Sequence, residues 1–357
     1  MKRKSIILLL VLTLVFTLLA GCAQDAKPTD PVQTGDNKGR VALILGVGGL
    51  GDQGFNDLSY AGAQRAKDEL GVDFIYAEPA QVSEIEMIMR DMCSSGENQV
   101  IIAVGFDSID AMTKIAQEYP EQQFAIVDAT IEQPNVASYV SKEHEGSFLV
   151  GMLAGYMAQD DSYGFRKNAV GFIGALETPF FHRFSKAYEA GVYYVNPDAT
   201  VEIGWVSGNN PFGDTTTAKE IALSQYNKGV GVIYHAAGGS GLGLFQAAKE
   251  ADLYAIGCNS NQNIIDPEHI AASMLKRADT ATFNIIKAAV IDENLPVGEE
   301  IELGLAASGI DYTLEGSAVP FSDEVLAKIE EAKAAISSGT LEAPVSQEEL
   351  DAFKAAH

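Results

Sequence analysis

The sequence has few of the residues that mark metal, disulfide and nucleic-acid chemistry. Among 357 residues there are three cysteines and five histidines, and 24 basic side chains are outnumbered by 49 acidic ones. There is no CxxC pair, and the histidines show neither HExxH nor H-x3-H spacing, which argues against a disulfide framework and a zinc site. Because a formal net charge of −25 repels a polyphosphate, nucleic acid is disfavoured as a partner.

Motifs for covalent or metal-assisted catalysis are absent as well. The chain contains no GxSxG nucleophile, no DxDxxxDD-like run of aspartates and no paired catalytic histidines. An enzyme is therefore the least favoured class, and we expect no cofactor and no metal. The sequence predicts a protein that binds a ligand without transforming it.

The N-terminus has the pattern of an export signal. Basic residues at positions 2–4 precede an apolar run over 6–20 that is too short for a comfortable membrane span. The run ends in LAGC, which resembles the lipobox at which bacterial signal peptides are cleaved and the new N-terminal cysteine receives lipid. We expect 1–21 to be a lipoprotein signal peptide and Cys22 to carry acyl chains such as palmitate. The alternative is an ordinary signal with a chance cysteine.

The next residues are polar and rich in Pro, Gly and Asp, so 22–39 cannot bury enough apolar surface to fold. They predict a disordered tether between a lipid anchor and a folded domain. The expected location is the extracytoplasmic face of the cell membrane, with contact to the membrane through the lipid anchor only.

Short apolar runs alternate with helical patterns along the rest of the chain, which is typical of parallel sheets covered on both faces. The expected strands are 41–45, 72–76, 100–104, 123–127, 169–173, 200–205, 231–235 and 254–257. The expected helices are 57–70, 82–94, 107–119, 144–158, 181–195, 215–226 and 242–251.

The folded part is longer than one hydrophobic core usually supports, so we expect two lobes. The prediction is an α/β protein with two doubly wound, Rossmann-like lobes joined by a hinge, the ligand lying between the carboxyl ends of both sets of strands. Lobe 1 is expected to comprise 40–137 plus about 263–305. Lobe 2 is expected to comprise 138–262 plus about 306–357.

The stretch VALILGVGGLGDQGFN at 41–56 fits two kinds of site. Gly46, Gly48 and Gly51 have the G-x-G-x-x-G spacing of a dinucleotide fingerprint after a strand. In such a site the third glycine lies in the first turn of the helix that meets the pyrophosphate. Here the periodic helix starts only around Asn56, so a dehydrogenase is disfavoured. The long loop instead brings three side chains to the cleft: Asp52, Phe55 and Asn56.

GGLGDQGFN resembles the GG-x-DD-x-SFN segment of the basic membrane protein family, the purine-nucleoside-binding lipoproteins that feed ABC transporters. The likeness covers nearly all of the chain from 41 to 344. Further similar segments follow in order: IVD at 126–128, EGSFL at 145–149, VGFIG at 170–174, AAG at 236–238 and SMLKR at 273–277. Single matches are weak, but their joint order is specific. The resemblance implies a type I periplasmic-binding-protein fold that closes over a nucleoside and delivers it to an ABC transporter permease.

The resemblance also implies roles at the base end of the ligand. Phe55 and Phe212 are expected to sandwich the flat base, the alternative for both being ordinary core packing. Gly238 is expected to let the backbone approach the ligand, because a side chain there would block it.

Other roles concern the sugar end. Asp128 is expected to accept hydrogen bonds from ribose hydroxyls, unless it caps a following helix. Lys276 matches the family's sugar-side lysine, the alternative being a solvated surface lysine. Asn56 is expected to bind ligand, to cap the first helix, or to do both, and Asp52 completes the expected set.

Two positions depart from the family pattern. The family usually has Asp where this chain has Gly46, and Val-Asp where it has Cys258-Asn259. An aspartate can only accept hydrogen bonds and suits guanosine or inosine, whereas Asn259 both donates and accepts, which complements adenine. We therefore predict that adenosine is favoured more than in relatives, unless Asn259 only supports its loop. A same-fold protein for another small polar ligand, such as a sugar or a modified nucleoside, remains the alternative, ahead of an exported enzyme.

Overall fold

The computed structural model describes residues 39–357. The predicted signal peptide, Cys22 and the tether up to residue 38 lie outside the described residues. Within 39–357, no helix is long and apolar enough to cross a membrane. Residues 39–357 belong to one compact unit, which contains two six-stranded sheets.

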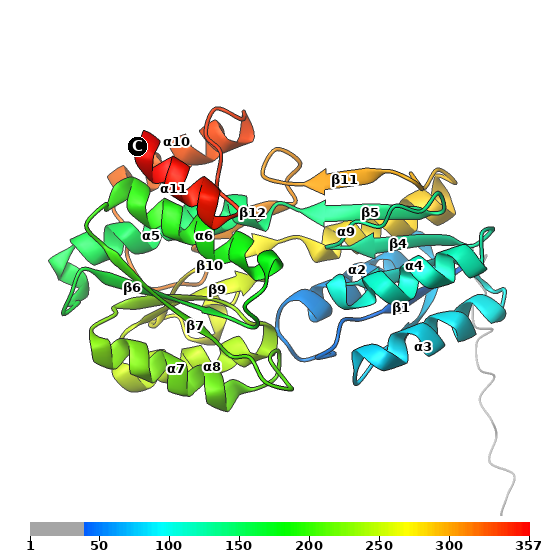
Figure 1. Ribbon diagram of the computed structural model, residues 1–357, viewed down its shortest axis with the longest axis horizontal. Coiled ribbons are helices and arrows are strands. Elements are labelled where there is room, and N and C mark those ends of the chain that lie inside the picture. Colours follow the sequence, from blue (N-terminus) through cyan, green and yellow to red (C-terminus); the bar gives the residue numbers. More distant parts are fainter. Residues whose placement is uncertain (1–38) are drawn as a thin grey trace, which may run out of the picture. The chain divides into compact units, whose positions relative to one another are not determined.

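The first sheet has the strand order β11-β5-β4-β3-β1-β2, and all its neighbouring strands are parallel. Its strands are β1 (Arg40–Ile44), β2 (Asp73–Ala77), β3 (Asn98–Val104), β4 (Gln123–Val127), β5 (Val136–Ser141) and β11 (Glu300–Leu303). Its helices are α2 (Phe55–Leu70), α3 (Val82–Ser94), α4 (Ile109–Glu118) and α9 (Ala278–Ile286). We call this sheet with its helices the first lobe (Figure 1).

Alternating side chains of β1 build two cores in the first lobe. Leu43 belongs to a cluster with Ala63 of α2 and Ile285 of α9. Ile44 belongs to a cluster with residues of α3 and α4, among them Met89. Because successive residues of a strand point to opposite faces, the apolar run at 41–44 in β1 implies helices on both sides.

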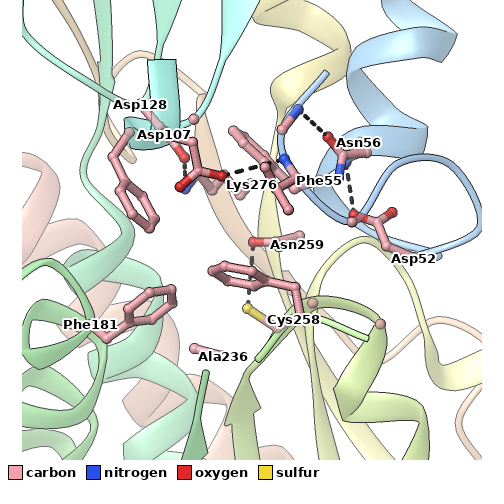
Figure 2. A pocket seen from close by; sticks show the side chains of 18 of the residues that line it. Asp52, Phe55, Asn56, Asp107, Asp128, Phe181, Ala236, Cys258, Asn259 and Lys276 are labelled. Carbon is pink, nitrogen blue, oxygen red and sulfur yellow. Dashed lines mark hydrogen bonds and ion pairs between the residues drawn. The ribbon is translucent and has the colours of Figure 1, made fainter. Parts of the chain in front are cut away.

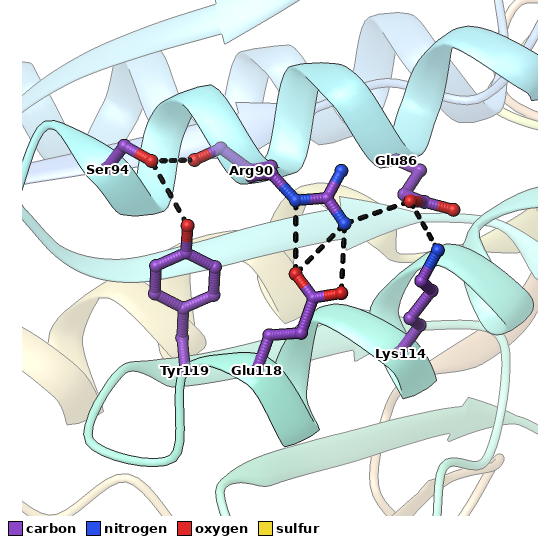
Figure 3. Close-up of polar contacts among 6 residues, drawn as sticks. All are labelled: Glu86, Arg90, Ser94, Lys114, Glu118 and Tyr119. Atoms are coloured by element: carbon purple, nitrogen blue, oxygen red, sulfur yellow. Dashed lines mark hydrogen bonds and ion pairs between the residues drawn. The ribbon is translucent and has the colours of Figure 1, made fainter.

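Charged side chains link α3 to α4 on the outer face of the first lobe. Arg90 donates to both carboxylate oxygens of Glu118 and to Glu86, which also pairs with Lys114 (Figure 3). These side chains are about one-third to one-half exposed, so water and salt screen the network. It holds two neighbouring helices together without contributing to the pocket described below.

The second sheet has the order β12-β10-β9-β8-β6-β7, in which only β12 runs antiparallel to its neighbour. Its strands are β6 (Ala169–Gly174), β7 (Thr200–Trp205), β8 (Val232–Ala236), β9 (Tyr254–Asn259), β10 (Ile270–Lys276) and β12 (Ile310–Thr313). Its helices are α5 (Glu143–Gln159), α6 (Pro179–Val195), α7 (Thr215–Lys228), α8 (Gly241–Ala251), α10 (Asp323–Ser337) and α11 (Gln347–Ala356). We call this sheet with its helices the second lobe (Figure 1).

Glycines allow α5 and α6 to pack closely. A Cβ atom added to Gly151 would lie 2.3 Å from the carbonyl oxygen of Tyr188, and one added to Gly191 would lie 2.0 Å from that of Phe148. Only glycine permits such an approach of two backbones. Gly151 and Gly191 therefore serve helix packing inside the second lobe, next to the point where the chain enters it.

Three segments connect the lobes. The chain crosses after β5 at Lys142, returns after β10 at Arg277, and crosses again over 304–309 between β11 and β12. Backbone hydrogen bonds hold the segments side by side, from Lys142 N to Leu303 O at 3.0 Å and from Arg277 N to Gly309 O at 2.9 Å. These paired crossings form the hinge region.

Two lobe boundaries differ from the expected ones. Residues from about 263 were expected in the first lobe, but β10 pairs in parallel with β9 in the second sheet. The return to the first lobe comes after Lys276. The first lobe also extends to Ser141, because β5 pairs with β4. An apolar strand suits either sheet, so only the pairing partner decides where it belongs.

The two sheets repeat one arrangement. In the two strand orders given above, β4 and β3 occupy the same positions in the first sheet that β9 and β8 occupy in the second. A residue with positive φ stands at or just after the carboxyl end of each of these strands: Gly105 directly after β3, Gly238 two residues after β8, Asp128 directly after β4, and Asn259 as the last residue of β9. Asp128 and Asn259, with φ of 70° and 71°, are thus equivalent positions of the two lobes.

Candidate ligand-binding site

A pocket with an empty volume of about 680 Å³ lies where the carboxyl ends of the two sets of strands face each other (Figure 2). All eight residues predicted to bind ligand line it: Asp52, Phe55, Asn56, Asp128, Phe212, Gly238, Asn259 and Lys276. The structure therefore brings the predicted set together, and their contacts show which side chains are available to a ligand.

Asp52 organises the glycine loop. Its carboxylate accepts hydrogen bonds from the backbone N–H groups of Gly54 and Asn56, at 2.8 and 2.9 Å, and from that of Asp57 at 3.3 Å. Burial raises the pKa of Asp52, and these backbone donors oppose the shift. Since its oxygens already serve the first turn of α2, Asp52 positions the loop that forms the pocket wall.

Asn56 offers a donor to the pocket. Its Oδ1 accepts from the backbone N–H of Gly46 at 2.9 Å, which fixes the amide plane. Its Nδ2 has no hydrogen-bond partner among residues 39–357. Asn56 is the second residue of α2, which begins at Phe55, so the interpretation of Asn56 as the N-cap is wrong. The late start of α2, four residues after Gly51, also agrees with an incomplete dinucleotide fingerprint.

Asp128 and Lys276 form an ion pair across the pocket. Asp128 follows β4 in the first lobe, and Lys276 is the last residue of β10 in the second. Lys276 Nζ contacts Asp128 Oδ2, and both side chains are almost fully buried. The other oxygen of Asp128 is buried and has no hydrogen-bond partner among the described residues. A buried acceptor without a partner is costly, so this atom suits a ligand that donates a hydrogen bond.

The surroundings of this pair exclude two other interpretations. No helix follows Asp128, because the chain continues into β5, so Asp128 is not a helix cap. Lys276 is only 3% exposed and is not a solvated surface lysine. Its ammonium lies 4.8 Å from the ring centroid of Phe55 and 5.6 Å from those of Phe180 and Phe184. Aromatic faces attract a cation at these distances and help to keep it in the pocket.

Glu143 adds a second carboxyl group behind the ion pair. It is 1% exposed, and Arg183 Nε lies 2.8 Å from its carboxylate. Burial raises the pKa of Glu143, while the positive charges of Lys276 and Arg183 oppose the rise. Asp128, Glu143 and Arg183 also line a second cavity, with an empty volume of about 740 Å³, which shares Phe106 and Phe180 with the first.

Aromatic rings form much of the remaining wall. Phe106 of the first lobe contacts two rings of the second, with centroids 5.4 Å from Phe180 and 6.4 Å from Phe212. Phe212 also packs beside two glycines: a Cβ added to Gly238 would lie 3.4 Å from a ring carbon of Phe212, and one added to Gly48 would lie 3.5 Å from its Cβ. These are ordinary contact distances, so the positive φ of Gly48 and Gly238 favours glycine at these positions more than the space beside Phe212 does. That Phe55 and Phe212 sandwich a base stays a prediction.

The lobes also meet through the loop after β9. Gln262 Nε2 donates to the carbonyl oxygen of Gln53 at 3.2 Å, and the Ser260 hydroxyl donates to the same oxygen. Gln262 Oε1 accepts from the backbone N–H of Cys258 at 2.8 Å and lies 3.0 Å from Nε2 of His235. One glutamine side chain therefore joins β8, β9 and the glycine loop of the other lobe.

Sequence patterns missed several pocket residues. Asp107 lines the pocket and accepts a hydrogen bond from Val47 N at 3.3 Å, and burial raises the pKa of its carboxyl. We expected it only as the first residue of a helix. The missed aromatic residues lie in or just before helices, where apolar periodicity indicates core packing: Phe106, Phe180, Phe181 and Phe184. Their position in the sequence, close to the carboxyl ends of expected strands, was the signal that could have indicated a place in the pocket.

The described residues offer no metal site, because no group of three or more His, Cys, Asp or Glu side chains within 39–357 is arranged to hold an ion. Hydrogen-bonding groups and aromatic faces are what the pocket presents. Such a lining can hold a small, flat, polar molecule by stacking and directed hydrogen bonds.

Comparison with known proteins gives consistent results. Residues 39–347 match a family described as "ABC transporter substrate-binding protein PnrA-like". An uncharacterized lipoprotein of Pyrococcus abyssi is 30% identical, the match covering 87% of this chain and 77% of the relative. The nucleoside-binding protein BmpA of an ABC transporter in Lactococcus lactis is 27% identical over 91% of this chain and 95% of its own. A crystal structure of an ABC transporter solute-binding protein from Aeropyrum pernix superposes with a TM-score of 0.80 at 30% identity, covering 89% of this chain and 98% of that one.

Proposed function

The chain belongs to the PnrA-like family of ABC transporter substrate-binding proteins, and on this basis we propose that it captures a purine nucleoside in the pocket between its lobes and delivers it to an ABC importer. It is a substrate-binding protein of two doubly wound α/β sheets, and not an enzyme. The nucleoside, the lipid anchor and the permease are the proposed elements.

One observation carries the proposal: the pocket combines aromatic faces with a buried ion pair that has a free acceptor. Phe55 and Phe212 line the pocket from different lobes, so that one ring could stack on each face of a flat base. Asp128 keeps one buried oxygen without a partner beside Lys276. Two neighbouring sugar hydroxyls would donate to this carboxylate and accept from the ammonium, satisfying both groups.

The base edge would meet the carboxyl end of β9. Asn259 lines the pocket from the second lobe, and Asn56 offers its Nδ2 from the first. Because Asn259 replaces the family's aspartate, we propose adenosine as the preferred ligand, ahead of inosine and guanosine. The amide of Asn259 pairs with the amino group and a ring nitrogen of adenine, as asparagine does when it reads adenine in DNA.

Delivery requires that the lobes separate and close around the ligand. The paired crossings at Lys142, Arg277 and 304–309 would serve as the hinge, the common mode of closure in exported binding proteins. The relative in Pyrococcus abyssi is named a lipoprotein. We propose that Cys22 likewise anchors this chain, with 22–39 as the tether that lets the lobes reach a permease.

Two measurements test the ligand assignment. Native mass spectrometry of the folded domain purified from cells identifies what co-purifies, and calorimetric titration ranks adenosine, inosine and guanosine. We expect Asn259→Asp to lower the affinity for adenosine relative to inosine and guanosine by roughly ten- to a hundredfold, since a buried mispaired group costs about 1–3 kcal/mol.

A matched control is Asn261→Asp, because Asn261 lies in the same loop and donates to Glu315 O, outside the pocket. It should leave the ranking unchanged. A sugar found by mass spectrometry, together with no heat of binding for any nucleoside, would refute the assignment and favour a same-fold protein for another polar ligand.

A further inference from the structure

A chain of four hydrogen-bonding groups runs through the core of the second lobe and ends at the pocket. Ser147 Oγ of α5 lies 3.1 Å from the hydroxyl of Tyr234 on β8. That hydroxyl lies 3.6 Å from the sulfur of Cys258 on β9. The thiol in turn donates to Asn259 Oδ1 at 3.4 Å, a contact drawn in Figure 2. Ser147 and Tyr234 are completely buried, and Cys258 is 2% exposed. The chain thus connects an apolar interior to the amide that faces the ligand.

The direction of the donors follows from counting hydrogens. Tyr234 is the only hydrogen-bond partner of the Ser147 hydroxyl within 39–357. If Ser147 donates to Tyr234, Tyr234 to Cys258 and Cys258 to Asn259, every hydroxyl and thiol hydrogen has an acceptor. In the reverse direction the Ser147 hydrogen would be buried without one, which folded proteins strongly avoid. The chain therefore runs from Ser147 towards Asn259.

The protonation states agree with this direction. Burial raises the pKa of the Cys258 thiol to about 12 and that of Tyr234 well above its usual value. Both groups keep their hydrogens at neutral pH and act as donors. Asn259 also sits at a positive φ of 71°, so its backbone leaves the strand in a defined turn. Its Oδ1 is fixed beside the sulfur, and its Nδ2 is left on the opposite side of the amide.

We propose that Cys258 and Tyr234 are positioning residues that hold the Asn259 amide in one orientation, so that the pocket distinguishes adenine from hypoxanthine. This inference rests on the proposed binding of a purine nucleoside. Adenine donates from its amino group and accepts at ring nitrogen N1, whereas hypoxanthine accepts at its carbonyl oxygen and donates from N1. An amide that rotates by 180° satisfies either pattern, because its donor and acceptor exchange places. An amide that the thiol holds in one orientation satisfies only one of the two hydrogen-bonding patterns.

The inference predicts a loss of discrimination rather than a loss of binding. The unaltered protein should bind adenosine about ten- to a hundredfold more tightly than inosine, as expected for one mispaired polar group. In Cys258→Val and in Tyr234→Phe the amide is released. The ratio of the affinity for adenosine to that for inosine should then fall to about threefold or less, mainly through tighter binding of inosine. Cys258→Ser keeps a donor at the same position and should keep most of the ratio.

The chain offers matched controls for both substitutions. Cys93 is the other buried free cysteine of the described residues and lies in the core of the first lobe, so Cys93→Val should leave the ratio unchanged. Tyr188 packs beside Tyr234, with centroids 5.3 Å apart, but its hydroxyl has no partner among the described residues. Tyr188→Phe should likewise leave the ratio unchanged. A general loosening of the core would affect controls and test variants alike.

The experiment is calorimetric titration of each variant with adenosine and with inosine, after circular dichroism has shown that the variant is folded. If Tyr234→Phe does not fold, Ser147→Ala interrupts the same chain one step earlier and should lower the ratio in part. The inference is overturned if the ratio is unchanged both in Cys258→Val and in Tyr234→Phe, or in Ser147→Ala where Tyr234→Phe does not fold. A preference of the unaltered protein for inosine overturns it as well. If the unaltered protein binds neither nucleoside, the proposed function itself fails.

Discussion

The ion pair between Asp128 and Lys276 should keep the lobes together in the absence of ligand. The two side chains come from different lobes and are nearly fully buried between them. Asp128→Asn removes the negative charge and leaves the Lys276 ammonium unpaired in the closed pocket. The protein has a way to relieve this, because separation of the lobes returns the ammonium to water.

The structure sets the size of the effect. Removing one partner of a buried pair typically costs about 3–5 kcal/mol. Glu143 lies near enough to attract Lys276, and the faces of Phe55, Phe180 and Phe184 do so as well, so we expect a cost of about 3 kcal/mol. Since each 1.4 kcal/mol is a factor of ten, the ratio of closed to open protein should fall about a hundredfold.

Small-angle scattering of the ligand-free protein measures this change directly. We expect a larger radius of gyration for Asp128→Asn than for the unaltered protein. Arg90→Gln is the control, because it breaks an ion-pair network on the outer face of one lobe and touches no lobe boundary. Identical scattering curves for the unaltered protein and Asp128→Asn would show that this pair does not hold the lobes together, and the reasoning would be refuted.

Three further outcomes are expected. A nucleoside that binds only the folded, closed form should raise the free energy of unfolding by about 2.7 kcal/mol at a hundredfold excess over the dissociation constant, seen as a higher Tm; no shift with any nucleoside would count against the proposed ligand. Burial lowers the pKa of His144 from 6.5 to about 3 and that of His235 to about 4, so the unfolded chain binds more protons below pH 6.5. The free energy of unfolding should therefore fall as the pH drops from about 6.5 to 4, by about 1.4 kcal/mol per pH unit for each histidine. The fall should be shallower in His144→Gln. Urea titrations at several pH values measure it, and an equal dependence on pH in both proteins would contradict the expectation. Cys22→Ala should release the protein into the medium or leave it uncleaved, and a variant that stays membrane-bound at unchanged mobility without incorporating labelled lipid would argue against acylation.

The central strands could be predicted from the sequence because each is an apolar run bounded by turn residues. β1, β3, β6 and β8 lie where they were expected, within one or two residues. The strands that were not predicted are β5, β10, β11 and β12, all on the side of their sheets next to the crossings. β11 and β12 have four residues each and mix charged with apolar side chains. Their pairing depends on partners far away in the sequence, which a local pattern does not contain.

The same distinction applies to the site. Residues at the carboxyl ends of central strands, such as Asp128 after β4 and Asn259 at the end of β9, were predictable because parallel strands bring their carboxyl ends to one edge. The placement of Phe180 was not, because the start of α6 has no pattern that separates a ring facing the core from one facing the other lobe. The chain from Ser147 to Asn259 was equally hidden, because its members are up to 112 residues apart and each looks like an ordinary core residue.

The left-handed backbone at Asp128 and Asn259 limits how this pocket can change its ligand. At such φ values, 70° and 71° here, Gly is unstrained and Asn and Asp are the side chains that adopt the conformation most readily, whereas bulky and β-branched side chains are strained. At both positions the practical choice is therefore between a carboxylate, an amide and no side chain at all. Variation among natural or engineered pockets of this shape should proceed in single steps between these three, one lobe at a time. A library restricted to nine combinations at the two positions would sample most of the ligand preferences that this backbone accepts.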